Sequence, residues 1–299
     1  MKDKIFTYIA LCLLLSVATA MLGACEDWNE PRPLEFETIG PDAQQPDLYA
    51  RYTQSLREYK KQPHYIVYAR LDNAPDVSTS EKDFLRAMPD SLDFVAMARS
   101  AQLTAFDRED MRRVQTEKGT RILWYADLNE GNTAVDKAIA GMTSEGFDGI
   151  SLAFAGAEVP DPDIIEKLTA VAGPRSNTGK VLLFEGNPAV LPEALREAFD
   201  YIVLSTSKLT TAYDLKFQVE YARQFAGIPA GKIIITAAPG GKLNDIGMES
   251  IIGTAQCVIS TGPVAGLGIY QAGNDYYDPL TNYKTIREAI RLLNPSPLN

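Results

Sequence analysis

The chain contains a single histidine, His64, and this scarcity limits the chemistry its side chains can perform. Catalytic triads, cysteine–histidine pairs and histidine-bound zinc sites all need imidazole groups. His64 stands at the start of an apolar run, where a structural role is expected. We therefore predict no metal site and no cofactor. The groups that remain are carboxylates, amides, hydroxyls and aromatic rings, a set typical of carbohydrate sites.

One segment, residues 147–155 (FDGISLAFA), places side chains at a spacing that could serve chemistry. Side chains alternate along a β-strand, so every second residue of this segment points to the same side. Those positions hold Ser151, Ala153 and Ala155, and Asp148 is the one carboxylate of the segment. An alanine donates no proton, so this side of the strand offers no general acid.

The elements around this segment alternate short apolar runs with stretches of helical period. The runs are continuous, as in parallel strands buried on both faces. We predict an α/β fold, a single (β/α)8 TIM barrel over residues 47–299. An open doubly wound sheet is the alternative, but the loop at 70–75 lacks its glycine-rich turn. Predicted strands are 65–69, 94–97, 121–125, 149–154, 181–184, 201–205, 233–236 and 266–270. Predicted helices begin at Asp47, which can cap the first, and continue at 107–118, 133–144, 162–172, 192–199, 213–225, 248–260 and 283–293.

In this order of elements, residues 147–155 resemble the fourth-strand signature DGxDxDxE of glycoside hydrolase family 18, the chitinases and endo-β-N-acetylglucosaminidases. The last strand, loop and helix, residues 268–295, are similar to those of family 18-like lipoproteins. The resemblance implies that the glutamate protonates the glycosidic oxygen and that the aspartate two places before it orients the acetamido group. Here the motif is degenerate: Asp148 is kept, Ser151 and Ala153 replace the aspartates, and Ala155 replaces the glutamate.

The resemblance and the missing acid together predict a catalytically inactive binding protein. We expect it to capture GlcNAc-containing, N-glycan-type oligosaccharides for a Sus-like uptake system, with an outer-membrane importer and neighbouring glycosidases as partners. The candidate glycan-binding residues lie at or just past strand ends. They are Asn73, Trp124, Tyr125, Asp127, Phe154, Glu185, Asn187, Ser205, Tyr270, Gln271, Asn274, Asp275 and Tyr276.

Two other functions stay open at this point. The first is an active endo-β-N-acetylglucosaminidase or other glycosidase that uses displaced carboxylates, with Glu185 as the acid and Asp127 or Asp275 as its partner. The second is a scaffold subunit whose barrel mouth is blocked by side chains. An assay of glycan binding and cleavage separates the three functions. Cleavage indicates the glycosidase, binding without cleavage indicates the binding protein, and neither indicates the scaffold.

The first residues have the pattern of an exported lipoprotein. Lys2 and Lys4 precede an apolar run at 9–22, as in a signal peptide. The sequence LGAC at 22–25 resembles a lipobox, so we expect residues 1–24 to be removed and Cys25 to carry a lipid that anchors the chain to the membrane. Residues 25–46, rich in proline, are predicted to form an extended tether. The acidic stretch 26–30 resembles an export tag and predicts display on the outer membrane, facing the exterior.

Charge and cysteine content argue against two further features, nucleic-acid binding and an intramolecular disulfide. The formal net charge is −10 and no Lys/Arg-rich stripe occurs, so nucleic acid is not an expected partner. Of the three cysteines, Cys12 leaves with the signal peptide and Cys25 is assigned to the lipid. Cys257 is then left without a partner in the chain, so no intramolecular disulfide is expected, and a hydrophobic core must hold the fold together.

Overall fold

The computed structural model describes residues 40–73, 78, 80–157 and 161–296. The predicted signal peptide, the lipidation site Cys25 and the acidic stretch 26–30 lie outside these residues. Within the described ranges, no helix combines the length and the hydrophobicity that a membrane crossing requires. The chain divides into two compact units, residues 1–49 and 50–299, and the second contains the barrel.

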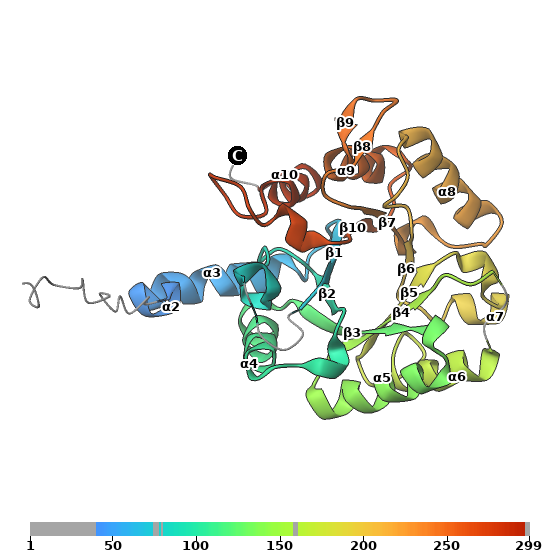
Figure 1. Ribbon diagram of the computed structural model, residues 1–299, viewed down its shortest axis with the longest axis horizontal. Helices are drawn as coiled ribbons and strands as arrows, with labels where there is room; N and C mark the ends of the chain where they lie inside the picture. The colour runs from blue at the N-terminus through green and yellow to red at the C-terminus, as the bar shows by residue number, and fades with distance from the viewer. Residues whose placement is uncertain (1–39, 74–77, 79, 158–160, 297–299) are drawn as a thin grey trace, which may run out of the picture. The chain divides into compact units, whose positions relative to one another are not determined.

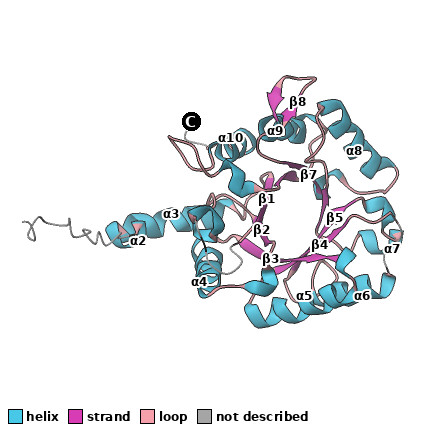
Figure 2. Cartoon of the chain, viewed as in Figure 1, coloured by secondary structure: helices cyan, strands magenta, loops and turns pink. Residues whose placement is uncertain are grey.

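Eight parallel strands close into a barrel in the order β1-β10-β7-β6-β5-β4-β3-β2, with helices outside the ring (Figures 1 and 2). This confirms the predicted (β/α)8 barrel. The strands are β1 (Ile66–Leu71), β2 (Phe94–Met97), β3 (Arg121–Asp127), β4 (Gly149–Phe154), β5 (Val181–Gly186), β6 (Tyr201–Leu204), β7 (Ile233–Ala237) and β10 (Gly266–Ile269).

Most helices of the repeats lie close to their predicted ranges, but the helix predicted over 192–199 is shorter and spans only Glu193–Arg196. Threonine side chains cap two of them: Thr104 accepts from the backbone of Asp107 at the start of α4, and Thr211 accepts from Asp214 at the start of α8. The helices are α2 (Pro41–Gln44), α3 (Pro46–Tyr59), α4 (Ala105–Arg113), α5 (Asn132–Glu145), α6 (Pro162–Val171), α7 (Glu193–Arg196), α8 (Ala212–Gln224), α9 (Ser250–Ser260) and α10 (Lys284–Leu293).

Three local predictions are corrected by the structure. Residues 41–44, expected to be extended, form the short helix α2, and α3 begins at Pro46, so Asp47 lies in its first turn. The predicted helix 107–118 ends its α-helical part at Arg113 and continues as a π-helical turn over 114–118. The segment after β7 forms a small antiparallel pair, β8 (Lys242–Leu243) and β9 (Met248–Glu249), so α9 begins at Ser250.

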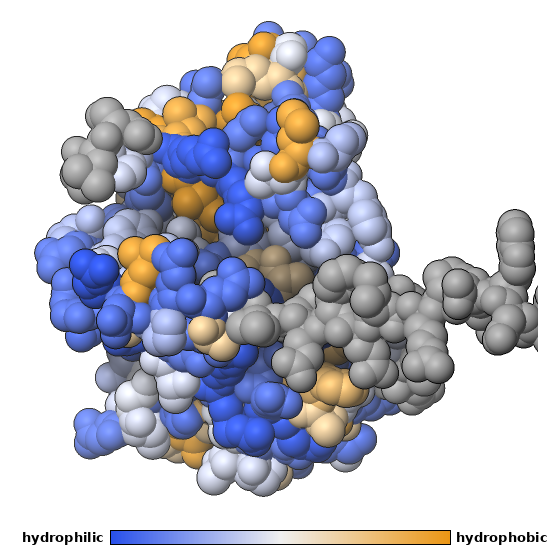
Figure 3. All heavy atoms as spheres, turned by 90° about the vertical axis from the view of Figure 1, so that its left-hand side faces the viewer, coloured by the Kyte–Doolittle hydropathy of each residue, from blue (hydrophilic) through white to orange (hydrophobic). Residues whose placement is uncertain are grey.

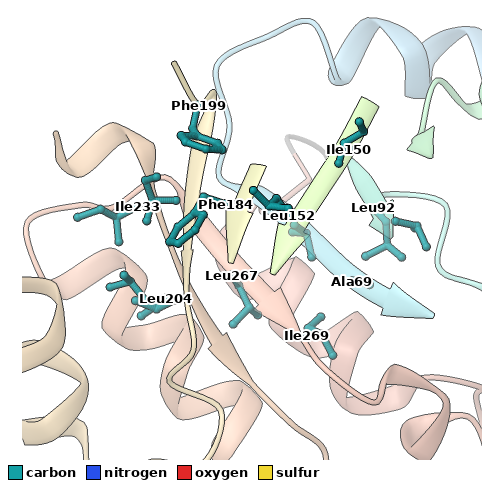
Figure 4. Packing of buried hydrophobic residues seen from close by; sticks show 14 of the residues in the cluster. Ala69, Leu92, Ile150, Leu152, Phe184, Phe199, Leu204, Ile233, Leu267 and Ile269 are labelled. Carbon is teal, nitrogen blue, oxygen red and sulfur yellow. The ribbon is translucent and has the colours of Figure 1, made fainter. Parts of the chain in front are cut away.

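Alternation along the strands divides the core into two parts. The larger part fills the space between strands and helices, where the side chains labelled in Figure 4, among them Ile150, Leu152 and Phe184, are buried. The smaller part fills the barrel interior and includes Tyr68 and Leu123. A residue's parity along its strand therefore decides whether it faces the helices or the barrel axis.

His64 lies at the amino-terminal end of the barrel, just before β1, as its position in the sequence indicates. Its Nε2 is 2.8 Å from Oδ1 of Asp93, whose Oδ2 accepts from the backbone N–H of Val67. The pair joins the starts of β1 and β2. The side of the molecule shown in Figure 3 is mostly hydrophilic, with small separate hydrophobic patches.

Candidate functional site

A cavity of about 520 Å³ opens at the carboxyl ends of the barrel strands, where active sites of such barrels occur. We call it the mouth cavity. Its walls combine tyrosine rings, carboxylates, amides, hydroxyls and two basic side chains. The residues that line it are Arg70, Asp72, Tyr125, Asp127, Asn129, Ala153, Phe154, Ala155, Glu185, Ser205, Ser207, Lys208, Ala238, Tyr270 and Gln271.

Glu185 at the end of β5 forms the centre of the cavity floor and is only 2% exposed. Its Oε1 accepts hydrogen bonds from the hydroxyls of Tyr68, at 2.5 Å, and Ser151, at 2.6 Å. Its Oε2 accepts from the hydroxyl of Tyr270, at 2.6 Å, and pairs with Nη2 of Arg70. Four donors, two from β1, one from β4 and one from the residue that follows β10, thus engage both oxygens of one carboxylate.

Arg70 is held between two aromatic rings as well as by Glu185. Its Cζ lies 4.4 Å from the ring centroid of Tyr125 and 4.1 Å from that of Tyr270. Burial is the largest single effect and would lower the pKa of Arg70, but the charge of Glu185 together with the smaller effects of Tyr68, Tyr270 and Tyr125 outweighs it, and the pKa is raised above its ordinary value. The guanidinium therefore stays charged and stacked in the cavity wall.

The tyrosines around Glu185 stay protonated and so remain donors. Burial raises the pKa of Tyr68 and of Tyr270 well above the usual value, and the negative charge of Glu185 raises both further. Burial also raises the pKa of Tyr125 to about 12. Because every neighbour donates, the carboxylate of Glu185 has no free lone pair that is directed at a ligand.

The degenerate positions of β4 face this same cavity. Ala153 pairs in register with Asp127 of β3 on one side and with Glu185 of β5 on the other. Ser151 lies one layer deeper, where it reaches Glu185, and Ala155 is exposed at the rim. The alternation expected from the sequence thus places the three positions on the inward side of the strand.

The structure brings seven of the predicted residues together and leaves six elsewhere. Those that line the mouth cavity are Tyr125, Asp127, Phe154, Glu185, Ser205, Tyr270 and Gln271. Gln271 does so from a left-handed backbone conformation, with φ 54°, which is uncommon for a residue with a side chain. Its position at the end of β10 is thus held at some cost in backbone energy.

Trp124 does not reach the mouth cavity, because side chains alternate along β3 and its neighbour Tyr125 is the one that points into the barrel. The indole packs against the ring of Phe147, with centroids 5.3 Å apart, in the layer between strands and helices. It also fills the space over Gly141 of α5, where an added Cβ would lie 2.0 Å from the indole.

Asn73 and Asn187 support the backbone rather than line the mouth cavity. Asn73 is fully buried, and its Oδ1 accepts from the backbone N–H of Arg99 at 2.9 Å. The side chain of Asn187 accepts from the backbone N–H of Ala189 and caps the short turn at 188–190.

The three residues predicted after β10 stabilise the last loop and helix. Oδ2 of Asp275 accepts from the backbone N–H of Ile286 at 2.8 Å, so this carboxylate caps α10 and is directed away from the mouth cavity. The ring of Tyr276 packs edge-on against Tyr283, with centroids 5.3 Å apart. The backbone N–H of Asn274 donates to Gln271 O within the same turn.

Sequence reasoning missed several polar residues of the cavity wall. The predicted first strand ends at residue 69 and places Arg70 in a loop, whereas in the structure β1 continues to Leu71 and Asp72 directly follows it. Ser207 and Lys208 follow the predicted contact Ser205 in the loop after β6, and Asn129 follows Asp127. These residues could have been found from their positions, because each lies within a few residues of a predicted strand end. In the described part of the chain, no group of acidic, histidine or cysteine side chains is arranged to hold a metal ion.

Comparisons with known proteins agree with the barrel fold. Among solved structures, the fold is similar to a selenomethionine variant of BT1044, with a TM-score of 0.70 and 19% identity over 85% of this chain and 95% of that one. It is also similar to an endo-β-N-acetylglucosaminidase from Cordyceps militaris, with a TM-score of 0.64 and 16% identity over 82% and 96% of the two chains. A chitinase from Bacteroides thetaiotaomicron gives a TM-score of 0.54 and 13% identity over 79% and 99%.

No curated protein matches the chain. The family model of glycoside hydrolase family 18, BT1044-like, matches residues 31–157 and 163–292, which is most of the sequence. The protein therefore belongs to glycoside hydrolase family 18, in its BT1044-like group.

Proposed function

We propose that the protein binds GlcNAc-containing oligosaccharides of the N-glycan type in the mouth cavity without hydrolysing them. The observation that carries this proposal is the exposure of Ala155 at the cavity rim. In the family pattern this position belongs to the glutamate that protonates the leaving oxygen. A methyl group supplies no proton, and general acid catalysis contributes about 10²–10⁴ in rate.

Glu185 is poorly suited to replace the missing acid. Its two oxygens already accept from Tyr68, Ser151, Tyr270 and Arg70, so both oxygens are engaged within the barrel rather than with a ligand. The alternative of a Glu185-based glycosidase also loses Asp275 as a partner, because that carboxylate caps α10.

Two further carboxylates, Asp72 and Asp127, lie at the cavity wall. Neither is buried, whereas burial in apolar surroundings is the usual means by which a protein keeps a general acid protonated. Oδ1 of Asp127 also accepts from the backbone and the side-chain amide of Asn129, at 2.9 and 2.6 Å. Both carboxylates are better suited to accept hydrogen bonds from sugar hydroxyls.

The wall composition fits a saccharide. Tyr125 and Phe154 offer half-exposed rings, which can pack on the apolar face of a sugar. Gln271, Asn129 and the serines of the β6 loop add neutral donors and acceptors around these rings. These contacts require no reactive group.

The proposal includes the cell surface as the place of action. It rests on the lipobox-like sequence that ends at Cys25 and on the acidic stretch 26–30. A lipid-anchored binder facing the exterior would hold oligosaccharides near an outer-membrane importer and near glycosidases that shorten them. Surface labelling of intact cells, with and without Cys25→Ala, tests this part on its own.

The central test combines a glycan array with a hydrolysis assay on the same sugars, using the purified protein. We expect retention of GlcNAc-containing glycans with no cleavage products. Tyr125→Ala should weaken retention at least about tenfold, since a stacked ring contributes on the order of 1 kcal/mol or more. Tyr213→Ala is the matched control, because that tyrosine is 73% exposed on α8. Turnover at enzymatic rates would overturn the proposal, and neither binding nor cleavage would favour a scaffold.

A further inference from the structure

A second, smaller cavity adjoins the mouth cavity at the end of β3. It measures about 250 Å³ and lies between the loop that follows β2, at 98–102, and the first turns of α5. Tyr125 and Asp127 line both cavities, so the two meet along the carboxyl end of β3. We call the smaller one the β2–β3 groove.

Hydrogen bonds hold the loop at 98–102, which forms the outer wall of this groove, in one position. The backbone N–H of Arg99 donates to Oδ1 of the buried Asn73, and its Nη1 donates to the carbonyl oxygen of the same residue at 2.6 Å. Ser100 Oγ donates to Met97 O and accepts from the backbone N–H of Tyr125 at 3.0 Å. The loop is therefore tied to the segment just after β1 on one side and to β3 on the other, which preorganises the groove.

Three long polar side chains surround the groove and have no assigned role within the protein. Gln102, Glu130 and Lys137 are all exposed. Within the described ranges, none of the three side chains makes a hydrogen bond or an ion pair to another residue. An amide, a carboxylate and an ammonium group offer both donors and acceptors in a groove that is also lined by alanines and Trp124.

This mixture favours a neutral, hydroxyl-rich ligand over a charged one. In the groove, the carboxylates of Glu130 and Asp127 are balanced by Arg99 and Lys137. In the mouth cavity, Asp72, Asp127 and Glu185 are partly balanced by Arg70 and Lys208. Neither cavity presents a field of one sign that would attract a polyanion or a polycation. Alternating donors and acceptors match the hydroxyl groups of a sugar ring.

We propose that the β2–β3 groove is a second saccharide subsite, so that a bound oligosaccharide runs from the mouth cavity over Tyr125 and Asp127 towards Lys137. This inference rests on the proposed glycan-binding function and adds ligand length to it. The protein should bind an extended oligosaccharide more tightly than the fragment that fills the mouth cavity alone, because the longer ligand gains the contacts of the groove without a second association cost.

Calorimetry with two neutral probes tests the subsite: the pentasaccharide core of N-glycans and its chitobiose fragment. We expect the unaltered protein to bind the pentasaccharide at least about tenfold more tightly. The double variant Gln102→Ala with Lys137→Ala should lose about 5–10-fold in pentasaccharide affinity, as expected for one or two hydrogen bonds, and keep its chitobiose affinity. Ala134→Tyr, which places a ring in the groove, should remove the length preference as well.

The matched control is the pair Lys216→Ala with Gln218→Ala, which changes the same residue types on the exposed side of α8. It should leave both affinities unchanged. Equal affinity for the two probes, or an unchanged length preference in the groove variants, would overturn the subsite while the proposed function stands. No binding of either probe by the unaltered protein would overturn the proposed N-glycan function and the subsite together.

Discussion

Arg70 and Glu185 form an ion pair that spans the diameter of the barrel. Arg70 belongs to β1 and Glu185 to β5, and these strands are four places apart in either direction around the ring of eight. Tyr68 reaches Glu185 from the same side as Arg70, while Ser151 reaches it from β4, the neighbour of β5. One carboxylate thus connects opposite walls of the barrel.

Glu185→Ala should destabilise the fold by about 3–5 kcal/mol, because it leaves the largely buried Arg70 cation and the Tyr68 hydroxyl without a partner. Urea denaturation gives the free energy of unfolding. The double variant Arg70→Met with Glu185→Leu removes the charge together with its partner and should recover much of that loss. A cost below about 1 kcal/mol for Glu185→Ala would show that the ion pair is not a stabilising contact.

The pair His64–Asp93 should make stability fall as pH rises. Nδ1 of His64 is 2.6 Å from the carbonyl oxygen of Gln62, and Nε2 is 2.8 Å from a carboxylate oxygen, so only the doubly protonated ring donates to both. The hydrogen bond to Asp93 raises the pKa of His64 above 6.5, against the opposing effect of burial. A raised folded-state pKa stabilises the protein below pH 6.5, and this stabilisation is lost as pH rises through the folded value.

The measurement compares the free energy of unfolding of the unaltered protein and of His64→Gln between about pH 6 and 9. The difference should be largest at the acidic end and shrink towards the alkaline end. Lys60, whose burial lowers its pKa to about 8, titrates in both proteins, and its positive charge lowers the pKa of His64, so the difference between the two proteins includes the coupling of these two groups. A difference that does not change with pH would contradict a protonated His64.

Ala155→Glu should restore a carboxyl group at the rim but not hydrolysis. The family mechanism also uses an aspartate two places earlier, and Ala153 holds that position. Release of a chromogenic aglycone from a chitobioside is the readout, and we expect no rate above that of the unaltered protein. Turnover by the single variant would show that the other elements of the active site are intact and that one substitution had silenced an enzyme.

Ser151→Asp tests how far the deeper position has diverged. Ser151 Oγ donates to Glu185 at 2.6 Å, and a carboxylate in its place would face another carboxylate in a buried site. We expect a loss of about 2–4 kcal/mol in the free energy of unfolding. Adding Glu185→Gln should recover part of that loss, and strict additivity of the two changes would contradict the contact.

Gln271→Gly should separate backbone strain from ligand binding. The left-handed conformation at φ 54° costs a residue with a Cβ roughly 1 kcal/mol, which glycine avoids, although glycine also loses more entropy on folding. We expect thermal stability to stay equal or to rise slightly, and glycan affinity to fall because the side-chain amide is gone. Unchanged affinity would remove Gln271 from the binding residues.

The barrel could be predicted because the same sequence pattern, an apolar run followed by an amphipathic helix, is repeated along the chain. Eight apolar runs with intervening helices require the same architecture even when single boundaries are off by two residues, as at β1 and β5. The short β8–β9 pair could not be predicted in this way, because two-residue strands have no periodicity.

The site was harder to predict, because in a strand that is buried on both faces the sequence does not show which side chains face the barrel axis. The run at 121–127 is apolar on either side, so the sequence does not reveal that Tyr125 faces the barrel and Trp124 the helices. A shift of one residue in the register of this strand would turn Trp124 towards the barrel and Tyr125 towards the helices. Asp275 shows a different limit, since its helix-capping contact with Ile286 joins residues that only the folded loop brings together.

The network around Glu185 also sets the depth to which any ligand can descend. Below it, the barrel interior is packed with Leu123, Leu183 and Val203, so nothing can thread into the axis. Any ligand is thereby confined to the last residues of the strands and the loops that follow them, where side chains can be exchanged while the packing of the barrel interior stays the same. A protein built in this way can change its ligand over evolutionary time while its folding stability is kept.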